Sequence, residues 1–415
     1  MSRPGKRRRG LAVWLALAAG IALPHTAIAD AEPPVWHGSL ANETAIELHD
    51  RDVSKFRNTF VPELTWDLSD NVRFTAAARL LWDPAFDGWE REAALREFAL
   101  DWKGEGWALK AGMQQVVWGQ ASGFLSSFDV FHPRDLREFV LPPFNFLRRP
   151  LWMVRAQQNL GDWTLEALWS PQEMADRTAD PGEPFYSPAP QPPGYAMLDG
   201  GSESDRQRLG TRLSRSFGAL DLALIYMKVP RNDAVYRREP AGTGVLRQTE
   251  LHRAFDVMGL SFARASRDTV WRGELSVYRG RDYQTRAAIG GVQQADQLNA
   301  VFGVDMTFFT DLEVTIEVGH RRIPDATADF IEPKARTTWL FQARKALWHD
   351  TVKLGLTVIA NQRDADTLWR PSLEWAASDR LTVSAGFDLF NGPANSPLGR
   401  FADRDRVYTG AAYRF

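Results

Sequence analysis

The chain lacks cysteine altogether, and beyond its N-terminal segment it lacks any long apolar run. With no Cys among 415 residues, no disulfide framework can stabilise it. No stretch past Ala29 reaches the roughly 20 apolar residues that a membrane-spanning helix requires. The formal net charge is −2, so no single-sign field points to a nucleic-acid partner. These absences argue against a disulfide-stabilised secreted protein, a helical membrane protein and a nucleic-acid-binding protein.

The N-terminus has the pattern of a secretory signal peptide. A basic segment precedes the uncharged apolar stretch Leu11–Leu23, and Ala27 and Ala29 occupy the two positions that a signal peptidase reads. The apolar stretch is short for a helix that spans a bilayer. We therefore predict that residues 1–29 are removed after export, with cleavage after Ala29, and that residues 30–415 form the mature protein.

Apolar and polar residues alternate along most of the mature chain. Between Leu312 and Arg321, Leu312, Val314, Ile316 and Val318 fall on one face, and the other carries Glu313, Thr315, Glu317 and Arg321. This period of two separates the faces of a β-strand, whereas in a helix the same residues would mix around the circumference. Leu381–Leu389 and Val352–Val358 repeat the pattern. The sequence therefore predicts an all-β protein.

The predicted strands form hairpins with arms of roughly 10 to 12 residues, the length that a tilted strand needs to cross a bilayer. Alternate connections are very short and rich in Asp, Asn, Ser and Gly, which tolerate the dihedral angles of tight turns. These turns are Leu68–Asn71, Lys103–Gly106, Gly161-Asp162, Phe217-Gly218, Ser266–Asp268, Thr310-Asp311, His349-Asp350 and Ser378-Asp379. The other connections are longer, and they include Gly119–Arg149, Ser170–Asp205, Pro230–Glu250 and Arg281–Ala295.

Short turns on one rim and long loops on the other are typical of outer-membrane β-barrels, in which the short side is periplasmic. Counting hairpins predicts a transmembrane antiparallel barrel of about 18 strands, from Val35–Leu48 to Arg404–Phe415. About 16 is the alternative count, because Phe56–Trp66 and Glu92–Trp102 alternate less cleanly. Many of the 16 Trp and 24 Phe residues stand near strand ends, where a lipid–water interface favours them. A soluble β-sandwich would alternate too, but it would have to be implausibly large.

The last strand ends in an assembly signal. Tyr413 and Phe415 lie on the same predicted face as Val407, Thr409 and Ala411, and Phe415 is the last residue of the sequence. This pattern resembles the C-terminal signal of bacterial outer-membrane proteins, which implies recognition by the barrel-assembly machinery. Outer-membrane lipid and lipopolysaccharide are the other expected partners.

The predicted inner faces carry charges of both signs. About 18 strands enclose an aqueous interior too wide for side chains alone to fill, so these charges are expected to be hydrated or paired and to influence ion selectivity. They are Arg57, Arg73, Arg79, Glu97, Lys110, Arg155, Glu166, Arg208, Arg212, Arg272, Glu274, Glu313, Glu317, Arg344, Lys353, Arg370, Glu374, Asp388 and Arg406.

Two connections have unusual compositions. The loop 119–149 interleaves phenylalanines with charged residues, including Asp129, Arg134 and Arg149. Because so apolar a loop is costly in water, it is expected to fold into the barrel mouth and constrict it. A helical turn is expected at Pro133–Phe139. An outward loop that touches lipopolysaccharide or a partner protein is the alternative. The Pro-rich segment 171–205 cannot be strand throughout, and it is predicted to be a long extracellular loop that acts as a second lid.

Motifs in the first of these loops resemble a family of outer-membrane proteins. GMQQVVWGQ, FDVFHPRDLREF, RRPLWMV and GDWTLEALWSP, within about Gly112–Pro171, are similar to an uncharacterised, porin-like proteobacterial family described only as a domain of unknown function. Members of the wider group occur beside systems that export lipids or hydrophobic compounds. The resemblance implies a barrel and makes this loop the functional element, with site residues Trp118, Gln120, Asp129, Pro133, Arg137, Glu138 and Arg149.

Three functions are compatible with these features. The first is a channel or substrate-selective porin, in which the folded loop and the wall charges select the solutes that pass. The second is a conduit for lipid or exopolysaccharide, which would work with an inner-membrane or periplasmic export partner. The third is an outer-membrane hydrolase, with His320 as the best-placed base, but no G-x-S-x-G or H-E-x-x-H motif supports it. We therefore expect no enzymatic activity, and the residue spacings indicate neither a metal site nor a cofactor.

Overall fold

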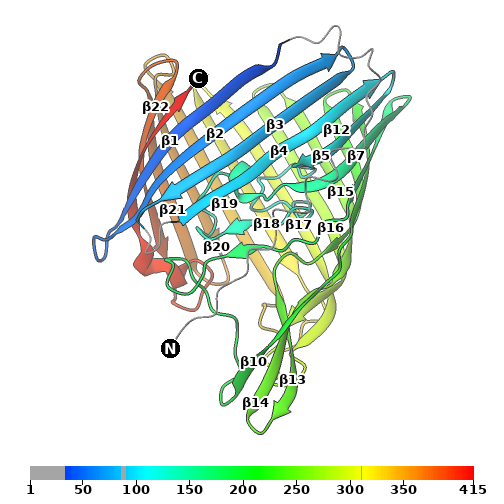
Figure 1. Cartoon of the computed structure of the whole chain (residues 1–415), viewed down its shortest axis with the longest axis vertical. Helices are drawn as coiled ribbons and strands as arrows, with labels where there is room; N and C mark the ends of the chain where they lie inside the picture. Colours follow the sequence, from blue (N-terminus) through cyan, green and yellow to red (C-terminus); the bar gives the residue numbers. More distant parts are fainter. Residues whose placement is uncertain (1–32, 86–89, 310) are drawn as a thin grey trace.

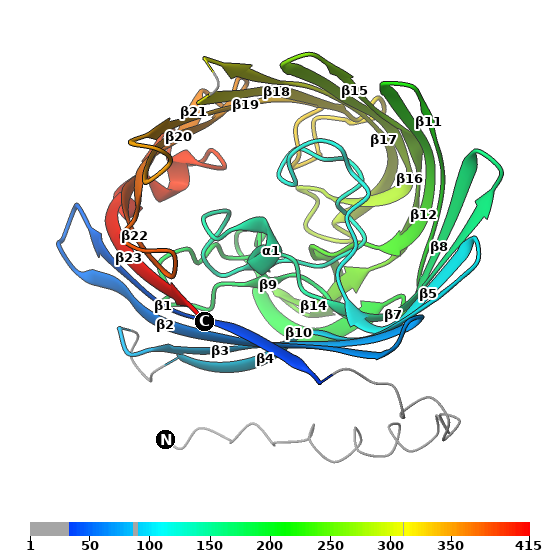
Figure 2. The same cartoon turned by 90° about the horizontal axis from the view of Figure 1, so that it is seen from above.

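The chain folds into a closed antiparallel barrel of 18 strands. The computed structural model describes residues 33–85, 90–309 and 311–415, so the predicted signal peptide lies outside it. The first barrel strand pairs with both the second and the last, which closes the sheet (Figure 2). The barrel strands are β1 (Val35–Glu47), β2 (Val53–Ser69), β3 (Val72–Asp83), β4 (Glu90–Gly104), β5 (Trp107–Gln114), β7 (Leu151–Leu160), β8 (Trp163–Ser170), β11 (Arg208–Phe217), β12 (Leu220–Pro230), β15 (Ala254–Ser266), β16 (Thr269–Gln284), β17 (Val292–Phe308), β18 (Leu312–Arg322), β19 (Ala335–Leu347), β20 (Val352–Asn361), β21 (Asp366–Ala376), β22 (Leu381–Asn391) and β23 (Arg406–Arg414).

Every predicted tight turn coincides with a junction between consecutive barrel strands on one rim. Thr310, in one of these turns, lies outside the described residues. The long connections share the opposite rim, so the asymmetry expected of an outer-membrane barrel is present. One predicted loop is too long: β16 continues to Gln284 and β17 begins at Val292, because the two strands keep pairing beyond the position expected from their alternation.

The alternation separates a lipid-type outer face from a polar inner face. On β18, Ile316 points outward, whereas the neighbouring Glu317 is fully buried inside. Large aromatic side chains stay exposed on the outside near strand ends, and Trp102 and Trp107 stack edge to face there with ring centroids 5.4 Å apart. Because this arrangement leaves apolar surface outside a closed sheet, it suits a bilayer rather than water.

A β-bulge explains why β4 alternates poorly in the sequence. Ala78 pairs with Leu95 but Ala77 pairs with Glu97, so Arg96 is an extra residue in the ladder. A bulge re-aims the side chains that follow it. The alternation between exposed and inward-facing positions therefore shifts by one residue after the bulge. β4 is nevertheless a full barrel strand, and the barrel has 18 strands, not 16.

The connections on the long-loop rim carry structure of their own. Residues 115–150, called the inner loop below, enter the barrel interior (Figure 2) and contain β6 (Asp135–Leu136) and α1 (Phe144–Leu147). β6 pairs in parallel with β9 (Arg177–Thr178), which belongs to the Pro-rich connection. Farther out, β10 (Ala196–Ser204), β14 (Val245–His252) and β13 (Val235–Gly242) form a small sheet that projects beyond the barrel (Figure 1).

The helical turn predicted at Pro133–Phe139 is wrong. The backbone there bonds to the Pro-rich connection instead, with the N–H of Arg177 donating to the carbonyl of Arg134 at 2.8 Å. The helical turn lies at α1, where Pro143 accepts the N–H groups of Phe146 and Leu147. Pro133 and Pro143 could each begin a helical turn, and the contact with the Pro-rich connection leaves only the one at Pro143.

Among the described residues, no helix is both long enough and apolar enough to cross a membrane.

Candidate functional site

Two buried glutamates of the barrel wall hold one half of the inner loop. Glu274 on β16 accepts the backbone N–H groups of Gln120, Ala121 and Ser127 at 2.8, 2.9 and 2.7 Å. Its oxygens also accept the hydroxyls of Ser126 and Ser127. A buried carboxylate is costly unless hydrogen-bonded, and here the loop supplies the donors.

Glu317 on β18 extends this support. Its carboxylate accepts the N–H of Ser122 at 3.0 Å and pairs with Arg272 of β16 at 2.8 Å. Arg272 in turn donates to the carbonyl of Gln120 at 2.8 Å. The first half of the inner loop is thus bonded to adjacent parts of the wall through both backbone and side chains.

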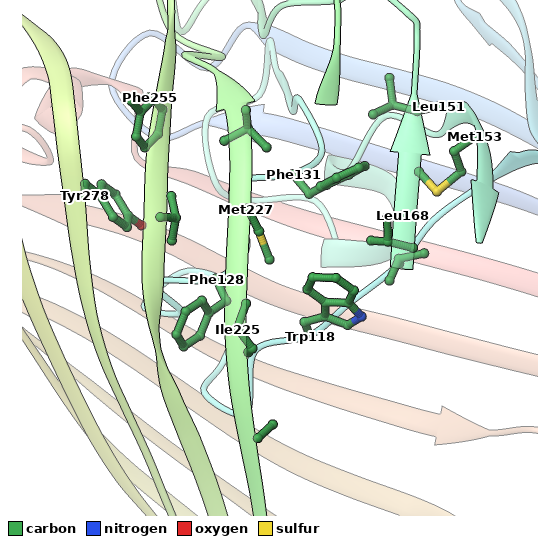
Figure 3. Packing of buried hydrophobic residues seen from close by; sticks show 14 residues of the cluster. Trp118, Phe128, Phe131, Leu151, Met153, Leu168, Ile225, Met227, Phe255 and Tyr278 are labelled. Carbon is green, nitrogen blue, oxygen red and sulfur yellow. The ribbon is translucent and has the colours of Figure 1, made fainter. Parts of the chain in front are cut away.

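Apolar packing fixes the same half of the loop. Phe128 and Phe131 are almost fully buried against the inner faces of β12 and β15 (Figure 3), and Trp118 packs beside them. The Trp118 indole N–H donates to Glu166 of β8, which also pairs with Arg155 at 2.6 Å. The cluster contains Val116, Trp118, Phe128, Phe131, Leu151, Met153, Leu168, Ala223, Ile225, Met227, Val229, Phe255, Val257 and Tyr278.

The middle of the inner loop is cross-linked by charged groups. Asp129 accepts Arg148 at 2.6 Å and pairs with Arg134 at 3.2 Å. The carbonyl of Pro133 accepts the N–H of Arg149, whose guanidinium donates to the carbonyl of Ala175 in the Pro-rich connection. Of the predicted site residues, Asp129, Pro133, Arg134 and Arg149 therefore lie together, and Arg149 ties the inner loop to the Pro-rich connection.

His132 in the inner loop and Asp176 in the Pro-rich connection are among the groups whose pKa values are shifted. Burial lowers the pKa of His132 to about 3, and its Nε2 accepts the N–H of Val116 at 2.9 Å while its Nδ1 lies 3.1 Å from the carbonyl of Arg149. Burial raises the pKa of Asp176 to about 6, with a further contribution from the charge of Asp233. Both groups hold loop backbone in place.

The other half of the inner loop meets a basic wall. Glu138 pairs with Lys55 of β2 at 2.5 Å, with Arg57 of the same strand, and with Arg406 of β23 at 3.6 Å. Beside it, Arg137 pairs with Glu92 of β4 at 2.7 Å and with Glu90. We call Lys55, Arg57, Arg137, Glu138 and Arg406 the septum.

The septum separates two cavities. The larger, called the vestibule below, has a volume of about 780 Å³ and extends to Ser39 and Arg414 at the rim of short turns. The smaller has about 20 Å³ and is covered by Glu183 and Phe185 of the Pro-rich connection. All five septum residues line both cavities. The septum is therefore the narrow point between the two sides of this part of the lumen.

The vestibule has two chemically different sides. Its wall presents basic side chains, including Arg79 and Arg370, while the inner loop presents Val140, Leu141 and Phe146. Seven basic and five acidic side chains line it, so the cavity carries an excess of positive charge. Such a surface can hold a small anion with an apolar body.

Two of the remaining predicted lumen charges contact the septum or its partners: Asp388 pairs with Arg406 at 2.8 Å, and Arg79 pairs at 2.6 Å with Glu92, the partner of Arg137. Arg208 is fully buried beneath the loops, where it donates to Asn232 at 3.1 Å and to the carbonyl of Met174. Glu313 is exposed. Four more are Arg73, paired with Asp67 at 2.5 Å; Lys110, paired with Glu97 at 2.7 Å and Asp101 at 3.0 Å; Arg344, paired with Glu374 at 3.1 Å; and Arg212, which lines a second polar cavity of about 620 Å³.

Lys55, Glu92 and Arg96 are among the residues of this site that were not predicted from the sequence. Lys55 lies on a strand with weak alternation, and Glu92 precedes the bulge of β4. Arg96, the bulged residue, donates to the carbonyls of Asn145 and Arg148 at the end of the inner loop. The break in alternation at Arg96 was the available signal for a re-aimed side chain.

His320 was the best-placed base for the hydrolase alternative. His320 contacts Thr337, with 2.9 Å between Nδ1 and the hydroxyl oxygen. Within residues 33–85, 90–309 and 311–415, no group of three or more His, Asp or Glu side chains is placed to hold a metal ion.

Comparison with known proteins places the chain among outer-membrane barrels. The profile of a family described as "Protein of unknown function (DUF1302)" matches residues 95–415, and no curated protein matches the chain. Pseudomonas aeruginosa OpdK, solved with vanillate, has a TM-score of 0.53 and 10% identity, covering 93% of this chain and 98% of OpdK.

Two further solved structures have the same fold. Pseudomonas aeruginosa OccK2 (OpdF), in complex with glucuronate, has a TM-score of 0.52 and 12% identity, covering 93% of this chain and 98% of OccK2. Acinetobacter baumannii OccAB3 has a TM-score of 0.50 and 10% identity, covering 94% of this chain and all of OccAB3 (100%). At these identities the likeness concerns the fold, which is that of outer-membrane porins.

Proposed function

The chain belongs to the DUF1302 family of proteins of unknown function, and from the geometry of its lumen we propose that it is an outer-membrane channel selective for small organic anions. The observation that carries this proposal is the vestibule, in which a basic wall faces an apolar loop and which ends at the septum. In this proposal the inner loop constricts the lumen, and the Pro-rich connection acts as a second lid at the extracellular mouth.

The chemistry of the vestibule supports this substrate class. Its volume of about 780 Å³ falls within the roughly 300–1,000 Å³ of small-molecule sites. Basic groups attract a carboxylate and raise its local concentration, while the apolar loop contacts the rest of the molecule. Two barrels of the same fold were solved with carboxylates, vanillate and glucuronate.

A comparison of uptake by charge tests the proposal. The mature protein is reconstituted into liposomes, and the entry of glucuronate is compared with that of glucose, which has a similar size and no charge. We expect faster entry of glucuronate, because the excess of basic groups favours anions. Equal rates for the two solutes would contradict selectivity for anions.

Deleting residues 122–146 tests the role of the inner loop. The variant should show a larger single-channel conductance in planar bilayers and a smaller preference for glucuronate, because the deletion removes Glu138 and the apolar side of the vestibule. If the intact and deleted proteins conduct equally, the loop does not constrict the lumen, and an open diffusion porin would be the better account.

The apolar lining also favours a second candidate function. Leu141, Phe144 and Phe146 offer a surface along which hydrophobic or polymeric cargo, such as lipid or exopolysaccharide, would move with the help of an export partner. Deleting the gene should then change the lipid or polysaccharide profile of the envelope. Unchanged profiles together with reduced uptake of organic anions would eliminate this candidate.

A further inference from the structure

We propose that Glu138 is an internal carboxylate that occupies the anion site of the septum, and that the carboxylate of an incoming solute must displace it before the solute can pass. This inference rests on the proposed function and adds how the site is regulated. The closed channel would thus be blocked by a carboxylate of its own, which is the same chemical group as that of the solutes it admits.

Three basic side chains from two wall strands converge on this one carboxylate. Lys55 and Arg57 come from β2 and Arg406 comes from β23, and each lies within ion-pair distance of Glu138. The side chain of Glu138 is 9% exposed, and those of Lys55 and Arg406 are 6% and 5% exposed. The loop has therefore inserted a carboxylate into a nearly buried basic pocket.

The basic pocket does not depend on Glu138 for its shape. Lys55 also pairs with Glu43 at 2.5 Å, and Arg406 also pairs with Asp388 at 2.8 Å. Arg57 keeps Glu90 as a partner on β4, at 3.3 Å. Because these acids are not part of the inner loop, they hold the basic groups in place when Glu138 leaves, and donors become available to a solute.

Displacement by another carboxylate is the favourable way to open the septum. Moving Glu138 away takes a buried charge-assisted partner from Lys55, Arg57 and Arg406, and the loss of such interactions is destabilising. A neutral solute cannot replace Glu138, and a cation would be repelled by the exposed basic groups. A carboxylate restores the lost interactions, so the septum rejects the wrong solutes as well as binding the right ones.

The structure confines this displacement to a short stretch. Residues 120–127 are fixed by Glu274 and Glu317, whereas Phe139, directly after Glu138, has a φ of +53°. This left-handed conformation is unfavourable for a bulky residue, and such strain favours movement once the ion pairs are broken. Phe139 packs against Phe401, with ring centroids 5.1 Å apart.

The test measures block of the single-channel current by benzoate, with neutral benzamide as the reference probe. Glu138→Gln should bind benzoate about tenfold more tightly than the wild type, because one charge-assisted competitor has been removed. Glu97→Gln is the matched control: it also removes a lumen carboxylate paired with a lysine, and Lys110 keeps Asp101 as a partner. This control should shift benzoate affinity by less than about twofold.

A disulfide lock gives a second, independent measurement. Leu136 and Thr178 are Cα partners where β6 pairs with β9, and the chain has no cysteine of its own. In Leu136→Cys/Thr178→Cys, oxidation should restrain the stretch next to Glu138 and reduce benzoate flux, and reduction should restore it. Equal fluxes in the oxidised and reduced states would overturn the proposal.

The results separate this inference from the proposed function. If the wild type prefers glucuronate to glucose but Glu138→Gln and Glu97→Gln bind benzoate equally well, the displacement model is wrong and the anion channel stands. If neither the wild type nor Glu138→Gln prefers glucuronate, the channel proposal itself fails.

Discussion

Ser127 donates both its backbone N–H and its hydroxyl to the same carboxylate oxygen of Glu274, at 2.7 and 3.0 Å. The two residues lie far apart in the sequence, one in the inner loop and one on β16, and Glu274 is 1% exposed. The loop and the wall therefore depend on each other, since neither the buried carboxylate nor the loop N–H groups have water as a substitute partner.

Replacing Glu274 should release the first half of the inner loop. Glu274→Ala removes the acceptor of three backbone N–H groups and two hydroxyls, and we expect the docked loop to lose about 3 kcal/mol or more. Limited proteolysis in detergent should then cut within residues 119–149 while the barrel remains folded. Glu313→Ala is the control, because Glu313 is an exposed lumen carboxylate; resistance of both variants would refute the prediction.

A methyl group at Gly119 should disrupt the same contact. An added Cβ would overlap the Ser126 hydroxyl and lie 2.9 Å from Glu274 Oε1. We expect Gly119→Ala to cost about 1–3 kcal/mol of loop docking, as overpacking usually does. At Gly319 the nearest atom is Leu125 Cδ2, 3.2 Å away at the end of a flexible side chain, so Gly319→Ala should be tolerated. Hydrogen exchange of residues 119–127 compares the two variants.

Acid should loosen the inner loop through His132. The backbone N–H of Val116 donates to Nε2 of His132. The neutral ring therefore carries its proton on Nδ1 and donates it to the backbone carbonyl of Arg149. Burial lowers the pKa of His132 from 6.5 to about 3, so its contribution to stability is complete above about pH 6.5 and is lost as the pH falls toward 3. The free energy that His132 contributes to the folded loop should change by at most about 1.4 kcal/mol per pH unit.

Asp176 opposes this effect in the wild type. Its pKa is raised from 3.8 to about 6, so its contribution is complete below about pH 3.8 and is lost as the pH rises through 6. We therefore expect Asp176→Asn to steepen the acid loosening, and His132→Asn to reverse its direction. Protease sensitivity of the inner loop between pH 3 and pH 7 is the readout, and identical profiles for the two variants would contradict both assignments.

Phe415 should serve assembly more than stability. Its backbone exchanges two 3.1 Å hydrogen bonds with Gly38, which Phe415→Ala retains, and its ring lies 6.3 Å from that of Phe60. We expect Phe415→Ala to reduce the amount of barrel in the outer membrane while refolding in detergent remains close to wild type. Equal losses in both assays would mean that the ring acts through packing, and Trp348→Ala, in an exposed turn, controls for loss of a surface aromatic.

The barrel, its strand order and its short turns could be predicted from the sequence because each depends on local information. Whether a residue faces lipid or lumen is decided position by position, as at Ile316 and Glu317, and a tight turn is decided by the few residues within it. The count was ambiguous at Phe56–Trp66 and Glu92–Trp102, and in the second of these segments a bulge at Arg96 breaks the alternation. The inner loop was recognisable because so many phenylalanines in one connection must be shielded from water.

Only the tertiary structure decided which charges meet. The sequence listed Glu274 and Glu317 as ordinary lumen charges, but burial beneath the loop makes them its anchors. Likewise, Glu138 reaches Lys55 and Arg406 because barrel closure brings β2 and β23 to the same side of the lumen. Ion pairs in a wide lumen carry no local signature: their partners depend on strand register, closure and the path of a loop, which emerge only when the whole sheet has closed.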